Sequence, residues 1–506
     1  MSKAIVLSTL NARYSHASIG LRYLYANLKE YKEQACILEF TLKDQPQSIA
    51  EKILAQQPQI VGLGVYIWNA LETQKVIHIL KQVAPEIKIV LGGPEVSYLP
   101  HRVDFAQADY IVPGEGEWGF YQLCHDILKQ QPPTERFFQV ELGELDSLAY
   151  PYPYYSEHDL AHRITYVEAS RGCPFTCEFC LSSLDQKVRK FDTQALLAQI
   201  ETLWQRGGRN FKFIDRTFNL SSAVTQQILD FFLAKPIPYF VHFEMIPDHF
   251  PSFLKEKLQQ FAPTTLQLEI GIQSLNPEVS GRIKRKLKPE IVKENLQFLA
   301  QHTHAHLHVD LIVGLPGESL QSFAQNLDTL VSWLDSEIQI GILKKLSGTD
   351  LFRHDHEFAM VYSEFPPYEI LQNNQISFQE MQEMKRFARF WDLTYNSGNF
   401  KQTIKLLWPD GKVFEHFLAF SRWLYQQSES TSHIALDRLA EYVFKYLSEI
   451  KGHDDQKLAA LLLQDLAKTQ GSRCPAFLKN YYYAEAKTQT QQIPKQIKRQ
   501  IKHAIS

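Results

Sequence analysis

The chain has 506 residues, of which 44% are hydrophobic and 22% are charged, and its formal net charge is −3. This length predicts two to four domains of ordinary globular composition. The near-neutral charge excludes a general electrostatic affinity for nucleic acid or anionic membranes, and no apolar run reaches the ~20 residues that span a bilayer. Because three of the six cysteines lie close together and the others are scattered, we expect thiols rather than disulfides and a protein of the reducing cytoplasm.

Strands alternate with helices over residues 1–145. Apolar stretches separated by helical patterns predict strands at 3–7, 36–40, 60–66, 87–91 and 109–112. This alternation is typical of a parallel, doubly wound sheet, so we predict an N-terminal α/β domain of the Rossmann-like, flavodoxin type. A polar loop follows the first strand, and glycines follow the later ones. These positions lie at the carboxyl edge of the sheet, where such folds bind ligands.

Three further regions follow this domain. Residues 150–155 are all tyrosine or proline, which indicates a linker over 146–160. Six strand–helix units then predict a partial (β/α)6 barrel over 161–360, with its chemistry at the carboxyl ends of the strands. Helical periodicity dominates 361–506 and predicts a mainly α-helical C-terminal domain. Most of its aromatic residues are expected to form its core, with a substrate lid as the alternative.

Cys173, Cys177 and Cys180 form a C-x3-C-x2-C cluster directly after the first barrel strand. Three thiolates can hold three irons of a [4Fe–4S] cube and leave one iron open for an exogenous ligand. A structural zinc site is the weaker interpretation, because it would need four ligands in two pairs and no second pair exists. Gly172 and Pro174 suit a loop that wraps a cluster, since one relaxes the backbone and the other fixes it.

With the aromatic Phe179 just before the third cysteine, this loop resembles the signature of the radical S-adenosylmethionine (SAM) superfamily. The resemblance implies that the open iron binds the amino and carboxylate groups of SAM, and that one electron cleaves SAM to a 5′-deoxyadenosyl radical. It also implies that the backbone at Phe179 approaches the adenine. A low-potential partner such as a flavodoxin or a ferredoxin would supply the electron.

Polar residues at the ends of the barrel strands predict a polar ligand, because buried carboxylates are costly unless they are paired or liganded. The stretch from Glu269 to Ser274 resembles the family's fourth-strand element, and 309–317 resembles its fifth-strand glycine motif. The family's Gly-Gly-Glu is missing, and Asp215 stands in its place, either to accept the SAM amino group or to pair with Arg216. The implied SAM site consists of Phe179, Asp215, Glu244, Glu269, Gln273, Ser274, Gly314 and Pro316.

The glycines of 62–64, 92–95 and 114–117 resemble those of the cobalamin-binding domain that precedes many radical SAM barrels. They would let the backbone approach the corrin and its nucleotide tail. The implied cobalamin contacts are Asn11, Ser15, His16, Gly64, Gly92, Gly93, Glu95, Gly114 and Gly116.

The cobalt-ligating pattern Asp-x-His-x-x-Gly is absent after the first strand. We therefore expect His16 to make ordinary hydrogen bonds, with cobalt ligation as the alternative. A domain that has lost its cofactor and only caps the barrel is a further alternative. The strong basic run at 282–288 lacks interleaved aromatic residues and is interpreted as a solvated helix start, with RNA binding as the alternative.

The three regions together resemble a subfamily of cobalamin-binding radical SAM proteins with a C-terminal helical domain of unknown function. The resemblance implies an enzyme that acts on a small molecule, and cobalamin-dependent methyl transfer to an unactivated carbon is the expected reaction. Oxidative cyclisation or rearrangement, as in the anaerobic magnesium-protoporphyrin cyclases, is the alternative reaction. A cobalamin or SAM sensor, or an assembly protein, is the alternative without turnover. The sequence assigns no catalytic residue and no substrate.

Overall fold

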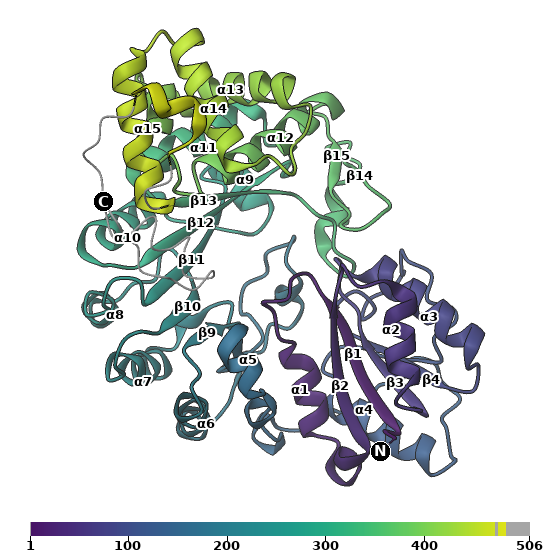
Figure 1. Cartoon of the computed structure of the whole chain (residues 1–506). Helices are drawn as coiled ribbons and strands as arrows, with labels where there is room; N and C mark the ends of the chain where they lie inside the picture. Colours follow the sequence, from purple (N-terminus) through teal and green to yellow (C-terminus); the bar gives the residue numbers. More distant parts are fainter. Residues whose placement is uncertain (1, 471–473, 482–506) are drawn as a thin grey trace. The chain divides into compact units, whose positions relative to one another are not determined.

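A computed structural model describes residues 2–470 and 474–481, which form two compact units (Figure 1). The first unit contains the residues up to Arg216 together with Lys344–Phe352 and Tyr362–Glu369, and the second contains Thr217–Leu343, Arg353–Val361 and the described residues from Ile370 onward. The end of the predicted helical domain, including a basic stretch at 495–502 for which the sequence suggests a solvated helix or a frayed end, lies outside the described residues.

The first unit begins with a five-stranded parallel sheet in the order β2-β1-β3-β4-β5. Its strands are β1 (Ile5–Asn11), β2 (Ala35–Thr41), β3 (Ile60–Gly64), β4 (Lys88–Gly92) and β5 (Tyr110–Val112). The helices among them are α1 (Ile19–Ala26), α2 (Pro46–Leu54), α3 (Ala70–Val83) and α4 (Glu117–Leu128). This order confirms the predicted flavodoxin-type sheet, whose strand order reverses between β1 and β3, the point at which such sheets bind ligands.

Helices bury both faces of this sheet (Figure 1). Ile53 of α2 and Leu80 of α3 pack with Val61 in one apolar cluster. Residues of α1 and α4, including Phe120, pack with Ile60 in a second cluster. The neighbours Ile60 and Val61 belong to different clusters because side chains alternate between the two faces of a strand. The two clusters leave the carboxyl edge of the sheet to the loops.

The segment predicted as a linker is folded into the first unit. It forms two 3-10 turns, Leu145–Ser147 and Tyr152–Tyr154, and the short helix α5 (Glu157–His162). Tyr152 and Tyr155 are each 1% exposed, and their hydroxyls donate to backbone carbonyls of the first barrel strand and its exit, at Glu168 and Tyr166. These tyrosines are therefore core residues.

The first unit also holds the start of the barrel region. Strands β6 (Thr165–Val167) and β9 (Asn210–Phe213) pair in parallel, and α6 (Thr193–Gln205) lies between them in the chain. An antiparallel pair of short strands, β7 (Ser170–Arg171) and β8 (Arg189–Lys190), precedes α6. This pair closes the base of the loop that carries the three cysteines.

The second unit contributes four parallel strands in the order β13-β12-β11-β10. They are β10 (Phe240–Met245), β11 (Leu266–Gln273), β12 (His306–Val313) and β13 (Glu337–Ile342). The accompanying helices are α7 (Ser222–Leu233), α8 (Ser252–Leu258), α9 (Pro277–Arg282), α10 (Pro289–His302) and α11 (Leu320–Trp333). With β6 and β9, the described residues contain the six parallel strands that the sequence predicts for a partial barrel.

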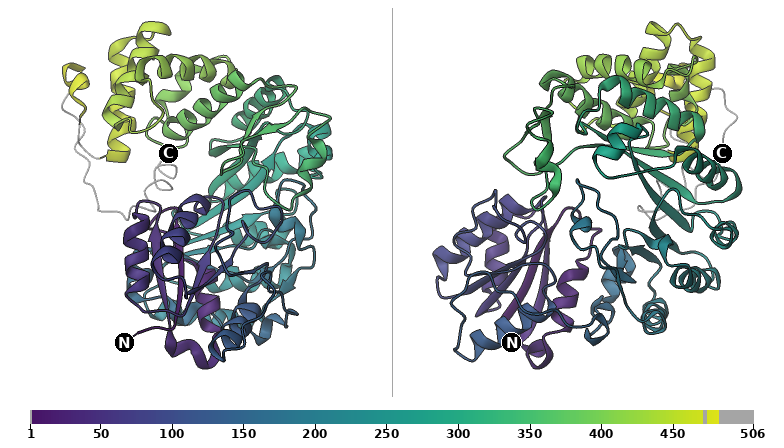
Figure 2. Two further views of the ribbon diagram at one scale, coloured as in Figure 1. Left: turned by 90° about the vertical axis from the view of Figure 1, so that its right-hand side faces the viewer. Right: turned by 180° about the vertical axis from the view of Figure 1, so that it is seen from behind.

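The helices of the predicted helical region lie in the second unit, whereas Tyr362–Glu369 belongs to the first (Figure 2). Short strands β14 (Val361–Tyr362) and β15 (Ile370–Gln372) precede the helices α12 (Phe378–Thr394), α13 (Val413–Ser428), α14 (Leu436–Lys445) and α15 (Asp455–Gln470). Trp391 is fully buried among Phe387, Tyr395 and Phe417, so the aromatic residues form a core as expected. No described helix has the length and apolarity needed to cross a bilayer.

We expect Trp391→Ala to destabilise the helical region by about 3–5 kcal/mol, because it leaves a large cavity. It also removes the indole N–H that donates to the Ile338 carbonyl at 3.0 Å. Differential scanning calorimetry should show a lower unfolding temperature. Trp423→Ala, at a half-buried tryptophan of α13, is the matched control and should cost less. Equal shifts for the two variants would contradict the assignment of Trp391 as the centre of this core.

Candidate functional site

The three cysteines lie on one loop. Cys173 and Cys177 are buried, whereas Cys180 and Phe179 are partly exposed. The N–H of Cys173 donates to the carbonyl of Asp185 at 2.8 Å, and the N–H of Cys180 donates to the carbonyl of Cys177 at 3.1 Å. All six cysteines of the chain lie in its described part, and none forms a disulfide. All six cysteines therefore remain thiols, as the sequence predicts.

This donor set fits a [4Fe–4S] cluster better than a single ion. The described residues hold no group of three or more His, Cys, Asp or Glu side chains that could bind one metal ion. In a four-iron cube each thiolate binds its own iron, so the sulfurs need not converge on one point. The loop supplies three soft ligands without a fourth, as a cluster with one open iron requires.

Gly172 sets the start of the cysteine loop. Its φ is +90°, a conformation that other residues rarely adopt. A Cβ atom at this position would lie 2.5 Å from the carbonyl oxygen of Lys187. The two sides of the loop can therefore approach closely only because residue 172 has no side chain.

Asp215 follows β9 and is buried. Its carboxylate accepts the N–H of Ala169 at 2.9 Å and the hydroxyl of Ser170 at 2.5 Å. Burial raises the pKa of Asp215 to about 7, although these hydrogen bonds act in the opposite direction. Asp215 therefore fastens the segment that leads into the cysteine loop, and its role toward SAM stays a prediction.

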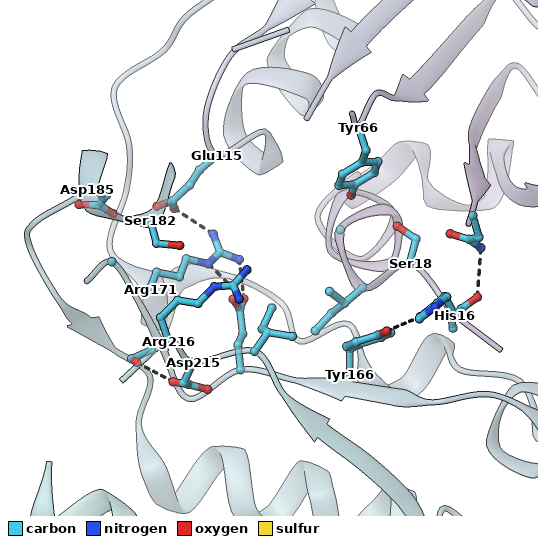
Figure 3. A pocket seen from close by; sticks show the side chains of 18 of the residues that line it. His16, Ser18, Tyr66, Glu115, Tyr166, Arg171, Ser182, Asp185, Asp215 and Arg216 are labelled. Atoms are coloured by element: carbon cyan, nitrogen blue, oxygen red, sulfur yellow. Dashed lines mark hydrogen bonds and ion pairs between the residues drawn. The ribbon is translucent and has the colours of Figure 1, made fainter. Parts of the chain in front are cut away.

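A cavity of about 620 Å³ lies beside these residues (Figure 3). We call it the loop cavity, because its walls come from the loops after β1 and β3 and from the start of the cysteine loop. Tyr66 and Trp68 line it and stack in parallel, with ring centroids 4.5 Å apart. Its polar lining includes Asn11, His16, Ser18, Glu115, Glu168, Arg171, Asp215 and Arg216.

A second cavity, of about 540 Å³, is lined by the ends of β3, β4 and β5 and by α1 and α4. We call it the glycine groove, because the structure brings five of the predicted cobalamin contacts together there, namely Gly64, Gly92, Gly93, Gly114 and Gly116. Leu181 and Ser182, which directly follow the third cysteine, line the same groove. At Gly93 φ is +105°, and a Cβ atom would lie 2.5 Å from the carbonyl oxygen of Val65.

The other four predicted cobalamin contacts lie elsewhere. Asn11 and His16 line the loop cavity, whereas Ser15 lies outside both linings. Glu95 is buried outside both linings and accepts a hydrogen bond from the hydroxyl of Tyr368. The structure therefore gives Glu95 a different partner from the one that the sequence suggests.

His16 makes the ordinary hydrogen bond that the sequence predicts. Its Nδ1 lies 2.5 Å from the hydroxyl of Tyr166. Burial lowers the pKa of His16, and the charges of Arg13 and Lys212 act in the same direction. The imidazole is therefore neutral near pH 7 and is held by Tyr166.

The SAM candidates of the second unit are tied into local networks. Glu269 pairs with His242 at 3.0 Å, and Glu244 lies opposite Glu269 in the register of β10 and β11. Ser274 is fully buried and donates to Glu318 at 2.5 Å. Burial raises the pKa of Glu318 to about 7, against the hydrogen bonds that it accepts.

The bends after β11 and β12 position the remaining SAM candidates. Gln273 has a φ of +69° and lies at a register shift between β11 and β12. At Gly314 a Cβ atom would lie 2.7 Å from the side chain of Ile370. The carbonyl of Pro316 accepts a hydrogen bond from Arg282 at 2.7 Å. Backbone geometry therefore positions this part of the predicted SAM site.

The basic run at 282–288 is only partly solvated, which corrects the sequence-based interpretation. Arg282 and Arg285 donate to the backbone carbonyls of Pro316 and Gly271, at 2.7 and 2.5 Å. The lysines of the run are exposed. Arg285 therefore supports the end of β11, and Arg282 supports the bend that follows β12.

Sequence reasoning missed the charged residues that line both cavities. Arg171 forms ion pairs with Glu115 at 2.9 Å, Glu117 at 2.7 Å and Glu168 at 2.8 Å. Although burial acts in the opposite direction, hydrogen bonds from Arg189 and Arg171 lower the pKa of Glu115. The signal was available, because two glutamates at the end of a buried strand need a cation.

Family models identify the chain. A B12 binding domain model matches residues 5–123, and a Radical SAM superfamily model matches 167–330. The chain is a radical SAM protein with an N-terminal B12-binding domain. A model described as a protein of unknown function (DUF4080) matches 356–505. These matches confirm the family that the cysteine and glycine motifs predict, together with the cofactor classes that its two known domains imply.

Relatives cover part of this radical SAM protein. It is 26% identical over 323 residues to the cobalamin-dependent radical SAM methyltransferase TokK of Streptomyces tokunonensis. It is also 26% identical over 310 residues to the 2-(S-pantetheinyl)-carbapenam-3-carboxylate methyltransferase of Streptantibioticus cattleyicolor. The two matches cover 56% and 54% of this chain and 46% and 45% of the relatives, so the chain spans under half of their length.

A solved structure shares the fold. The cobalamin-dependent SAM radical enzyme OxsB, with aqua-cobalamin and SAM bound, is 13% identical. The match covers 92% of this chain and 79% of that chain, with a TM-score of 0.60. At this identity the likeness shows a common architecture.

We expect Gly172→Ala to abolish iron retention after reconstitution with iron and sulfide, because the new methyl group collides with the Lys187 carbonyl. Gly207→Ala is a matched control, since Gly207 has a φ of +95° but no atom within 4 Å of an added Cβ. Iron per protein should fall in the first variant only. Normal iron content in Gly172→Ala would contradict the tight closure of the loop.

Asp215 should make stability depend on pH. Between its ordinary pKa of 3.8 and its folded pKa of about 7, the unfolded chain loses the proton while the folded chain keeps it. The contribution of Asp215 is therefore full below about pH 4 and falls by about 4 kcal/mol as the pH rises to 7. Relative to wild type, Asp215→Asn should gain in unfolding temperature between pH 5 and pH 8. Asp230→Asn, at a carboxylate that is 44% exposed, is the control and should follow the wild-type profile.

Proposed function

We propose that this chain is an enzyme that binds a [4Fe–4S] cluster, SAM and cobalamin, and transfers a methyl group to an unactivated carbon of a small molecule. One observation carries the proposal: Leu181 and Ser182, directly after Cys180, line the same groove as the five glycines. Residues suited to two different cofactors therefore share one cavity wall. A methyl transfer that uses both cofactors needs this adjacency.

Each proposed cofactor has a set of residues that suits it. Cys173, Cys177 and Cys180 would hold the cluster, whose open iron would bind SAM. The glycine groove offers the room that a corrin or its nucleotide tail needs, since five side chains are missing from its walls. When bound, these cofactors supply a 5′-deoxyadenosyl radical and a transferable methyl group. The two relatives named as methyltransferases support this reaction class.

The chain's own residues would prepare the site. The Tyr66–Trp68 stack gives the loop cavity an apolar wall, which limits the access of water to a reactive intermediate. Tyr166 holds His16 through Nδ1, and because the Asp-x-His-x-x-Gly pattern is missing we do not expect His16 to bind cobalt. Asp215 orders the segment before the cysteines through Ala169 and Ser170. A flavodoxin or ferredoxin remains the expected electron donor.

Anaerobic reconstitution with iron, sulfide and hydroxocobalamin, followed by desalting, tests the proposal. The wild type should retain iron and a near-stoichiometric corrin absorption band. Cys177→Ala should lose iron, because one of three ligands is removed. Gly92→Val should keep iron and lose the corrin, because it fills the groove while its Cβ stays 3.6 Å from the nearest atom. Gly341→Val, with the same 3.6 Å clearance on β13, is the matched control and should keep both.

Turnover separates an enzyme from a binding protein. With SAM and a low-potential reductant, the reconstituted protein should release 5′-deoxyadenosine, and Cys177→Ala should not. Retention of iron without corrin would contradict the proposed cobalamin-dependent methyl transfer and would favour cyclisation or other direct radical chemistry. Retention of both cofactors without SAM cleavage would favour a sensor.

A further inference from the structure

Arg171 lies at the centre of a buried group of charges. It ends β7 and stands two residues before Cys173. Its side chain is 12% exposed, and its carboxylate partners Glu115, Glu117 and Glu168 are 18%, 6% and 8% exposed. All three pairs have nitrogen–oxygen distances below 3.0 Å. Such charge-assisted pairs are strong when water is excluded and costly when one partner is withdrawn.

The partners of Arg171 come from both candidate cofactor sites. Glu115 belongs to the loop between β5 and α4, which we call the glycine loop because it also contributes Gly114 and Gly116 to the glycine groove, and Glu117 is the first residue of α4. Glu115 also pairs with Arg189 of β8, on the other side of the cysteine-loop base. Both strands that close the cysteine loop are therefore bound to the glycine loop through one carboxylate.

Packing limits how far the Arg171 guanidinium can move. It stacks over the ring of Tyr23 of α1, with 4.8 Å between the guanidinium carbon and the ring centroid. Arg171 and Glu115 line the loop cavity (Figure 3). Both residues also line the glycine groove. A shift of either loop would separate buried charges that have little water to replace their partners. The cysteine loop and the glycine loop are therefore expected to move together.

We propose that Arg171 is a positioning residue that couples the two cofactor sites: cluster binding by the cysteine loop tightens cobalamin binding in the glycine groove, and the reverse. This inference rests on the proposed function, since it concerns the same two cofactors. Coupling of two binding equilibria is reciprocal and typically changes affinity five- to 150-fold. The ion pairs provide the physical link, because ordering one loop orders the other.

The test compares the affinity for hydroxocobalamin with and without the cluster. Anaerobic titrations followed by absorbance would use chelator-treated protein and reconstituted protein. In the wild type the cluster should tighten hydroxocobalamin binding about tenfold. In Arg171→Met this ratio should fall to about one, while the three cysteines still retain iron. Arg206→Met, which removes an arginine paired with Glu157 outside both cavities, should keep the tenfold ratio.

A second variant is needed in case Arg171→Met misfolds, because this substitution removes the cation that the three carboxylates share. Glu115→Gln removes the most exposed of the three and keeps the pairs of Arg171 with Glu117 and Glu168. It should reduce the ratio to a few-fold and decides the question if Arg171→Met fails to give a native circular dichroism spectrum. A merely structural role would weaken both affinities and leave their ratio unchanged.

The outcomes for the two proposals differ. Failure of the wild type to bind hydroxocobalamin or iron would overturn the proposed function and this inference together. Binding of both cofactors with a wild-type ratio of one would overturn the coupling alone. A ratio of about ten that persists in both Arg171→Met and Glu115→Gln would show that Arg171 does not carry the coupling.

Discussion

The buried ion pairs of Arg171 are the interaction on which the arrangement of the first unit depends. A desolvated guanidinium is stable only when anions replace the water that it has lost. Glu115 and Glu117 come from the sheet domain, and Glu168 comes from the start of the barrel region. Arg171 and its three glutamates are paired in this arrangement of the loops, and a different arrangement would separate them. Apolar packing at the same place would tolerate sliding, whereas paired charges with directional hydrogen bonds do not.

Two other buried carboxyl groups are held mainly by neutral hydrogen-bond donors instead of by a cation. Asp215 and Glu318 are held mainly by hydroxyl, amide and backbone N–H donors, and burial raises the pKa of each to about 7. Near neutral pH each can therefore carry or lose a proton. Each lies beside a predicted SAM-binding segment, Asp215 in the first unit and Glu318 in the second, so each unit holds a weakly acidic group next to such a segment.

Missing side chains shape the proposed cofactor space as much as the side chains present. The glycine groove exists because residues 64, 92, 93, 114 and 116 have no Cβ atom at the edge of a closely packed sheet. At Gly93 and Gly172 the backbone itself is so close that a methyl group would meet a carbonyl oxygen at 2.5 Å. These positions lie beside the two loops that Arg171 joins. The glycine groove and the ion pairs of Arg171 therefore lie at the same edge of the sheet.

The sequence by itself determined the strand–helix alternation, the three-thiol loop and the glycines at the strand ends, because these depend on residues that are close along the chain. It did not reveal the burial of Tyr152 and Tyr155 or the pairing of Glu95 with Tyr368, 273 residues away. Nor did it indicate that Glu115 and Glu117 pair with Arg171. Only the tertiary structure decided these contacts, because the stability of a buried charge or hydroxyl depends on which distant segments replace its water.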